Sequence, residues 1–266
     1  MSGFPPAFLS STSNSFVELA RSLAPETLPS TDGSDLAGQT PEGTTILCFR
    51  TATGILMAGD RRATIGNLIA SHSMEKVKAA DDFSVIGIAG TAGVALDLIR
   101  LFQLELEHYE KIEGARLSLH GKANRLASML RGNLGLALQG LTVVPLFAGV
   151  DDSTPHGQIF SFDVTGGKYE EHRFHAIGSG SGFARGALKK LWRADLDTDA
   201  AITVAVEALF DASDDDSATA GPDFVRQIAP TVFTVDLDDG VTEIDSAAVL
   251  SAATEVVDRR TRSARS

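Results

Sequence analysis

The order of the predicted elements favours an α+β fold in which two sheets pack face to face and helices cover their outer sides. A group of short strands is followed by two helices, and a second group of strands is followed by two more helices. The strands predicted at 45–50 and 55–60 are apolar at consecutive positions, which is typical of strands that are covered on both faces. With 266 residues, of which 43% are hydrophobic, the chain can bury a substantial core.

The first group of strands begins with a hairpin. Its two strands, 45–50 and 55–60, are joined at a turn through Thr53 and Gly54. Charged or glycine-bearing turns separate three further strands, which we expect at 68–72, 76–79 and 83–89.

Two helices then follow. Apolar residues recur at helical spacing between Thr91 and Ile112, which predicts a long helix. A second helix begins near Ser118, and its apolar face is predicted from Leu126, Leu130 and Leu134, which lie one turn apart.

The second half repeats this order. Glycines at 166–167 and in the run 178–182 mark turns. Strands are expected at 143–150, 158–163, 168–172, 232–237 and 241–244. Helices are expected from the glycine run to Leu191, at 198–212 and, as a cap, at 246–259.

Residues 1–43 differ from the rest of the chain. They are rich in Ser, Thr, Pro and Gly, and their one apolar patch lies at 16–20. Such a segment buries too little apolar surface to offset the entropy that it loses on ordering. Two interpretations stay open, a disordered tail and a pro-segment that docks on the folded domain. Either way, a boundary separates a leader at 1–43 from a domain at 44–266.

Composition argues against several classes of function. The formal charge of -12 and the pI near 4.9 disfavour binding to nucleic acid or anionic membranes, because both repel an acidic surface. The single cysteine, Cys48, cannot form an internal disulfide, so a reducing cytoplasm is the expected compartment. No apolar run approaches the roughly 20 residues that span a bilayer, and the N-terminus lacks the features of a secretory signal.

The boundary falls immediately before a threonine, Thr44. A threonine freed at a new N-terminus has a nucleophilic hydroxyl and, in its own α-amine, a base with a pKa of about 7.7–8.0. The preceding Gly43 has no Cβ, so the hydroxyl can approach its carbonyl and an N-to-O acyl shift is sterically feasible. Lys76 is the candidate cation that would lower the amine pKa, and Asp60 is the candidate anion that would orient Lys76. Spacing alone leaves open that both are ordinary surface residues.

Six motifs together carry a resemblance to a known family. They are Gly-Thr-Thr-Ile at 43–46, Met-Ala-Gly-Asp-Arg-Arg-Ala-Thr at 57–64, Lys-Val at 76–77, Gly-Ile-Ala-Gly-Thr-Ala-Gly at 87–93, Ala-Ile-Gly-Ser-Gly-Ser at 176–181 and Asp-Asp-Asp-Ser-Ala-Thr at 214–219. In order and spacing, the chain from Gly43 to Arg259 resembles the β subunit of the actinobacterial 20S proteasome, an N-terminal nucleophile hydrolase. The resemblance implies a four-layer αββα sandwich of two mostly antiparallel sheets, with a threonine protease site at one end of the sheets.

The resemblance also implies roles for individual residues. Thr44 would be the nucleophile after cleavage of the Gly43–Thr44 bond, Asp60 and Lys76 would be its charge partners, and Gly90 would supply a backbone donor to the oxyanion hole. The polar network around the threonine amine and its water would be formed by Ser179, Asp216 and Thr219.

The pocket for the residue before the scissile bond is implied in the same way. It would be lined by Ala63, Thr64, Met74, Lys78, Ile88 and Ala92. Because most of these side chains are apolar or small, we expect a preference for bulky apolar residues there, which Lys78 would blur.

Two features near the end of the helix at 198–212 bear on these roles. The carboxylates at 214–216 lie where the helix dipole disfavours them by a few tenths of a kcal/mol to about 1 kcal/mol, so a use other than stability is indicated. The family usually has a second glycine at the position of Ala220. If that position requires a left-handed backbone, alanine costs about 1 kcal/mol and would shift Thr219.

Four other patterns are set aside. The glycine run at 178–182 is not followed by Gly-Lys-Ser/Thr, so the phosphate-binding fingerprints fail and a tight turn is favoured. His172 and His175 would point to opposite faces of one strand, which argues against a metal pair. The acidic run 211–216 lacks the glycine of a calcium loop. Cys48 lies between two apolar residues and is expected to be a core thiol.

The resemblance implies a proteolytic ring subunit that is made as an inactive precursor and needs neither cofactor nor metal. It would form a heptameric β-ring stacked with rings of proteasome α subunits. An ATP-dependent unfoldase would feed it unfolded proteins, some of them tagged by a ubiquitin-like protein. Two alternatives are a six-fold ATP-dependent bacterial threonine protease and a non-catalytic ring scaffold. The first has Gly-Asp-Gly-Gln where this chain has Gly-Asp-Arg-Arg at 59–62, and the second would not need Thr44, Asp60 and Lys76 together.

Overall fold

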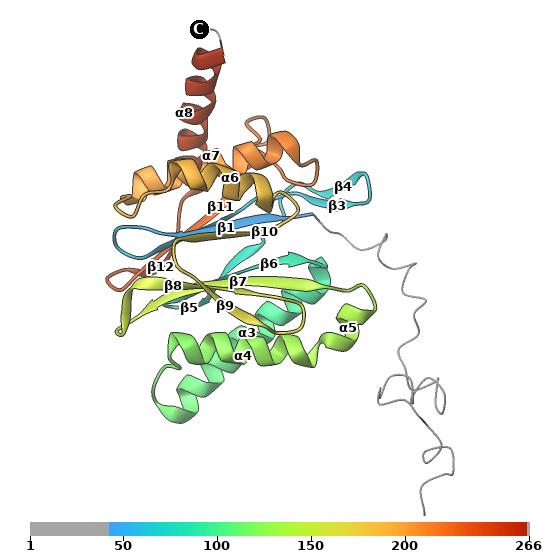
Figure 1. Ribbon diagram of the computed structural model, residues 1–266, viewed down its shortest axis with the longest axis vertical. Helices are drawn as coiled ribbons and strands as arrows, with labels where there is room; N and C mark the ends of the chain where they lie inside the picture. The colour runs from blue at the N-terminus through green and yellow to red at the C-terminus, as the bar shows by residue number, and fades with distance from the viewer. Residues whose placement is uncertain (1–42, 265–266) are drawn as a thin grey trace, which may run out of the picture.

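The computed structural model describes residues 43–264, so residues 1–42 of the expected leader lie outside the described part of the chain. Figure 1 shows four layers, in the order helices, sheet, sheet and helices. The predicted αββα sandwich of two antiparallel sheets is confirmed.

The first sheet has the strand order β10-β1-β2-β11-β12, and all of its pairs are antiparallel. β10 forms one edge and pairs with β1, where Gly178 lies opposite Thr45. This pairing brings the glycine run after β10 next to Thr44. The strands are β1 (Thr45–Arg50), β2 (Ile55–Gly59), β10 (Phe174–Gly178), β11 (Thr231–Asp236) and β12 (Gly240–Glu243).

The second sheet has the order β5-β6-β7-β8-β9 and is also antiparallel throughout. Its strands are β5 (Val77–Asp81), β6 (Ser84–Gly90), β7 (Val143–Asp151), β8 (Thr154–Phe162) and β9 (Lys168–Glu171). A separate hairpin of β3 (Ala63–Ile65) and β4 (Leu68–Ser71) follows β2. The sheets thus place the residues just before β5 and at the end of β6 opposite the start of β1.

Helices cover the outer face of each sheet (Figure 1). The second sheet is covered by α3 (Ala92–Glu113) and α4 (Leu119–Gly132), and the short α5 (Leu134–Leu138) follows them. The first sheet is covered by α6 (Ser181–Leu191) and α7 (Thr198–Asp215), and α8 (Ser246–Ala264) packs on α7. No helix in the range 43–264 is both long and apolar enough to cross a lipid bilayer.

Alternation along β1 explains its continuous apolar run. Ile46 and Cys48 face the layer between the two sheets, whereas Leu47 and Phe49 face α6 and α7. All four side chains are fully buried. The expectation of a core thiol at Cys48 is confirmed, and burial raises the pKa of that thiol well above its ordinary value.

The region around the two histidines differs from the prediction. β9 ends at Glu171, and β10, which the sequence did not predict, begins at Phe174. His172 lies in the bend between these strands, and His175 lies in β10. The two side chains therefore belong to different elements, and the argument that placed them on opposite faces of one strand is wrong.

Two shorter departures also have local causes. The second helix ends at Gly132, a poor helix former, and Leu134 starts the separate α5 with 37% of its surface exposed. Leu134 therefore does not continue the apolar face of α4. The strand β3 spans only three residues, which is too short to give a periodic pattern.

Candidate active site

Thr44 lies directly before β1, with only 5% of its surface exposed. Its hydroxyl donates a hydrogen bond to the carbonyl oxygen of Gly43, with Oγ1 2.6 Å from that oxygen. Gly43 has a φ of +92°, a left-handed conformation that favours glycine. A Cβ added there would lie 2.7 Å from Thr64 Oγ1 and 2.9 Å from the Cβ of Ala218. The left-handed φ and the lack of room for a Cβ together require a glycine at position 43.

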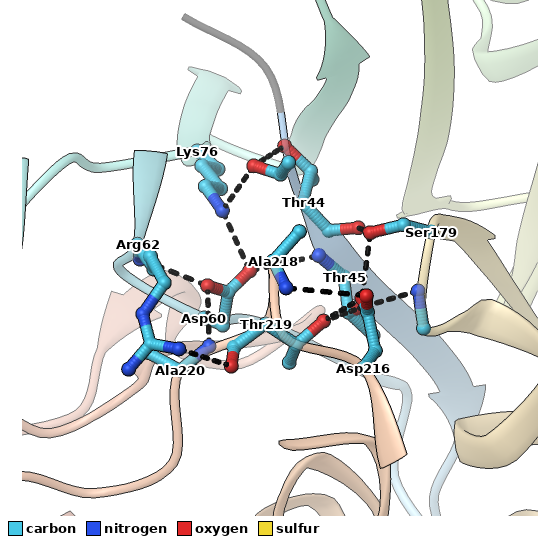
Figure 2. A network of polar contacts seen from close by, with 12 residues as sticks. Thr44, Thr45, Asp60, Arg62, Lys76, Ser179, Asp216, Ala218, Thr219 and Ala220 are labelled. Carbon is cyan, nitrogen blue, oxygen red and sulfur yellow. Dashed lines mark hydrogen bonds and ion pairs between the residues drawn. The ribbon is translucent and has the colours of Figure 1, made fainter. Parts of the chain in front are cut away.

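Asp60 and Lys76 meet beside this peptide bond from different sheets (Figure 2). Asp60 follows β2 of the first sheet, and Lys76 precedes β5 of the second. Lys76 Nζ lies 2.6 Å from Asp60 Oδ1 and donates a further hydrogen bond of 2.8 Å to the Gly43 carbonyl oxygen. Both side chains are buried, so neither is an ordinary surface residue. Burial lowers the pKa of Lys76, and the charge of Asp60 opposes that shift.

Backbone donors hold the Asp60 carboxylate in place. Its Oδ1 accepts from Thr45 N at 2.7 Å, and its Oδ2 accepts from Arg62 N at 2.8 Å and from Ala220 N at 3.0 Å. Gln227 is the only non-glycine residue with a left-handed φ in the described part of the chain. Ala220 is therefore not left-handed, and the strain that an alanine would suffer in such a conformation is absent.

A second polar network joins β1 to the turn after β10 (Figure 2). Ser179 Oγ and Thr219 Oγ1 each donate to Asp216 Oδ2 over 2.6 Å. Ser179 N also donates to the Thr44 carbonyl oxygen over 2.9 Å. Asp216 caps the C-terminal end of α7, so the structure gives this carboxylate the separate use that its unfavourable helix position indicated.

Two residues of the site were missed in the sequence, Thr45 and Arg62. The Thr45 hydroxyl lies 2.6 Å from that of Thr219 and accepts from Gly180 N at 3.0 Å. Arg62 Nη1 donates to the carbonyl oxygens of Ser217 at 2.9 Å and Thr219 at 3.3 Å. A polar residue in an otherwise apolar strand was the one available indication for Thr45, and nothing in the spacing indicated Arg62.

Gly90 lies at the end of β6 and lines a cavity together with Thr44. Its φ is +116°, and a Cβ added there would lie 2.2 Å from the carbonyl oxygen of Thr142. No other residue type fits this position without displacing the backbone of the loop before β7.

The cavity beside Thr44 is lined by four of the six residues expected in the substrate pocket, namely Ala63, Met74, Ile88 and Ala92. Its volume is about 10 Å³, which is room for about one water molecule. A bulky side chain can enter only if a lining side chain moves. Met74, with its unbranched and flexible side chain, is best suited to do so.

Thr64 and Lys78, the other two expected pocket residues, do not line this cavity. Lys78 forms an ion pair with Glu75 and is partly exposed. The hydroxyl of Thr64 lies close to Gly43 instead, at the bond before Thr44. The cavity thus lacks these two polar side chains, but the charged Glu75 and Lys76 line it together with the apolar residues.

Comparison with known proteins decides the family of the chain. A sequence model described as proteasome subunit matches residues 40–225. A protein of Stackebrandtia nassauensis named proteasome subunit beta is 53% identical over 263 residues, which cover 96% of this chain and 94% of that protein. The chain belongs to the proteasome β-subunit family. A second proteasome subunit beta, from Acidothermus cellulolyticus, is 59% identical over 229 residues, which cover 84% of this chain and 79% of that protein.

The matched range of this proteasome β subunit includes the whole site from Gly43 to Thr219. Within the described residues, no three or more His, Cys, Asp or Glu side chains are grouped so as to hold a metal ion. His175 instead pairs with Glu171, with Nδ1 3.0 Å from the nearer carboxylate oxygen.

Proposed function

We propose that this proteasome β subunit is a threonine endopeptidase that is made as a precursor and cleaves its own Gly43–Thr44 bond. The observation that carries the proposal is the double contact on the Gly43 carbonyl oxygen, from the Thr44 hydroxyl at 2.6 Å and from Lys76 Nζ at 2.8 Å. Lys76 polarises the carbonyl, and the Thr44 hydroxyl is within reach of its carbon. Attack forms an ester bond between Thr44 Oγ1 and the Gly43 carbonyl carbon, the peptide C–N bond breaks, and the hydroxyl proton passes to the nitrogen, which becomes the α-amine. Water then hydrolyses the ester and releases the leader with a carboxylate at Gly43.

The freed α-amine of Thr44 then acts as the general base. Its unperturbed pKa of about 7.7–8.0 suits this role, and the Lys76 charge beside it favours the neutral amine. Thr44 Oγ1 attacks the substrate carbonyl while the amine takes its proton, and the N–H of Gly90 stabilises the oxyanion. The amine passes the proton to the departing peptide, and water hydrolyses the acyl-enzyme. The network of Ser179, Asp216 and Thr219 is anchored on the Thr44 carbonyl oxygen through Ser179, and we infer that it positions the freed amine.

Family membership supports the proposed assembly. We infer a ring of β subunits, expected to be a heptamer, that stacks on rings of proteasome α subunits in the cytoplasm. An ATP-dependent unfoldase would deliver unfolded substrates, some of them carrying a ubiquitin-like tag. A six-fold bacterial protease is disfavoured by the Arg-Arg that follows Asp60 and by the named relatives. A non-catalytic scaffold is disfavoured by the buried ion pair next to Thr44.

N-terminal sequencing of the assembled protein tests the proposed processing. The mature chain is expected to begin at Thr44, because that is the bond on which Lys76 and the Thr44 hydroxyl converge. Fully assembled particles whose chains still begin at Met1 would rule out self-cleavage as the route to activity.

The proposed preference for bulky apolar residues before the scissile bond makes Met74 the residue to change. We expect Met74→Ala to raise kcat/KM for a large aromatic residue relative to alanine at that position by about tenfold, because the narrow cavity widens by several heavy atoms. The measurement is a comparison of fluorogenic peptides that differ only there. Lys78→Met is the matched control and should leave the profile unchanged, since Lys78 does not line the cavity. An unchanged profile in Met74→Ala would place the specificity pocket elsewhere.

A further inference from the structure

A second cleft, of about 490 Å³, also borders Thr44. Gly43, Thr44 and Gly90 line both spaces, so the nucleophile lies between them. The second cleft continues along β10 and reaches Arg185 on α6. A peptide that places one side of its scissile bond in the apolar cavity must direct the other side into this cleft.

The edge of the first sheet borders this cleft. Within residues 43–264, β10 pairs only with β1, and Ser179 N bonds to the Thr44 carbonyl oxygen. Because main-chain groups alternate in direction along an antiparallel strand, those of Gly178 point away from β1. An extended peptide can therefore align beside β10 and use its unpaired edge.

Charge is distributed unevenly in the cleft. Arg185 is exposed and forms no ion pair or hydrogen bond with any residue in the range 43–264. Burial lowers the pKa of His175 below its ordinary value, so this second basic residue is neutral at pH 7. The neighbouring carboxylates Glu171 and Asp216 do not line the cleft. Glu171 is paired with His175 and accepts from Ser161, and Asp216 accepts from Ser179 and Thr219. Among the described residues, Arg185 thus carries the only side-chain charge that lines the cleft at neutral pH.

We propose that this cleft binds the leaving-group side of the peptide and that Arg185 selects for an acidic side chain there. The inference rests on the proposed peptidase function and adds a substrate preference to it. The chain as a whole carries a net charge of -12, so an unpaired cation next to the nucleophile sets this cleft apart from the rest of the acidic molecule. A lysine in the substrate would meet Arg185 as a like charge.

Internally quenched peptides test the proposal on the assembled, processed enzyme. All share the residues up to the scissile bond and carry Asp, Asn or Lys in turn at the first, second or third position after it. At one of these positions we expect kcat/KM to be roughly two- to fivefold higher for Asp than for Lys, the size of an exposed ion pair. Raising the salt concentration should reduce that ratio, because it screens exposed charges.

Variants at two exposed basic positions of α6 test whether Arg185 causes the difference in kcat/KM between the Asp and Lys peptides. Arg185→Gln should bring the Asp-to-Lys ratio to about one, Arg185→Glu should invert it, and Arg185→Lys should retain it. Lys190→Gln, which removes a positive charge from the same helix but outside the cleft, should leave the ratio as in the wild type.

The outcomes separate the two proposals. If the Asn peptides are cleaved but Asp and Lys give equal rates at all three positions, the subsite is wrong and the peptidase stands. A ratio that persists in Arg185→Gln would likewise overturn the role of Arg185. If no peptide of the set is cleaved by enzyme that has lost its leader, the peptidase function itself fails.

Discussion

Thr44→Ala is expected to abolish both leader removal and peptide hydrolysis, because one hydroxyl makes both attacks. The chain should remain at full length in mass spectra, and kcat/KM for an apolar fluorogenic peptide should fall by at least about 10⁴-fold, the scale seen when a hydrolase loses its nucleophile. The fold should persist, since the side chain contributes one exchangeable hydrogen bond to its own neighbour.

Thr44→Ser is the matched control for that variant. It keeps the hydroxyl and removes only a methyl group, so the chain should still lose its leader and hydrolyse peptides. A Thr44→Ala chain that nevertheless begins at residue 44, or that hydrolyses the peptide at the wild-type rate, would refute the proposed nucleophile.

Lys76→Ala is expected to lose activity and stability together. The variant leaves the Asp60 carboxylate buried without its cationic partner, which costs about 3–5 kcal/mol. It also removes the donor to the Gly43 carbonyl oxygen, so the chain should stay unprocessed. Denaturant unfolding of this variant is best compared with that of Thr44→Ala, because both retain the leader and only Lys76→Ala breaks the buried ion pair.

Two further variants separate the loss of activity from the loss of stability. Asp60→Asn combined with Lys76→Met removes both buried charges and should recover part of the stability while leaving the enzyme inactive; recovery is incomplete because the asparagine amide cannot accept from donors on both sides as the carboxylate does. Lys78→Ala removes a partly exposed lysine two positions along the chain and should change the free energy of unfolding by no more than about 0.5 kcal/mol. An active double variant would show that the charge pair serves stability alone.

The sequence predicted those features that depend on local chemistry. The continuous apolar runs of β1 and β2 indicated strands covered on both faces, and the strands alternate between two buried layers. Gly43 was singled out for its missing Cβ, and its backbone is left-handed. The structure brings Thr44, Asp60 and Lys76 together at one peptide bond.

The remaining features depend on contacts that spacing does not encode. β10 is a strand because it pairs with β1, more than a hundred residues earlier in the chain. Arg62 is part of the site because its guanidinium group donates hydrogen bonds to carbonyl oxygens in the loop after α7. Lys78 was expected in the pocket, yet it does not line the cavity and instead pairs with Glu75, which does.

Because the site is formed by residues from both sheets, it can be complete only late in the synthesis and folding of the chain. Thr44 leads into the first sheet, Lys76 leads into the second, and Ala220, whose backbone N–H holds the Asp60 carboxylate, follows a helix that is made much later. A nascent chain holds the first two long before the third has left the ribosome. The proposed self-cleavage therefore has to wait until synthesis has passed residue 219 and the two sheets have closed on one another. The fold therefore sets the earliest point at which the precursor can become active, and an incomplete or misfolded subunit stays inactive.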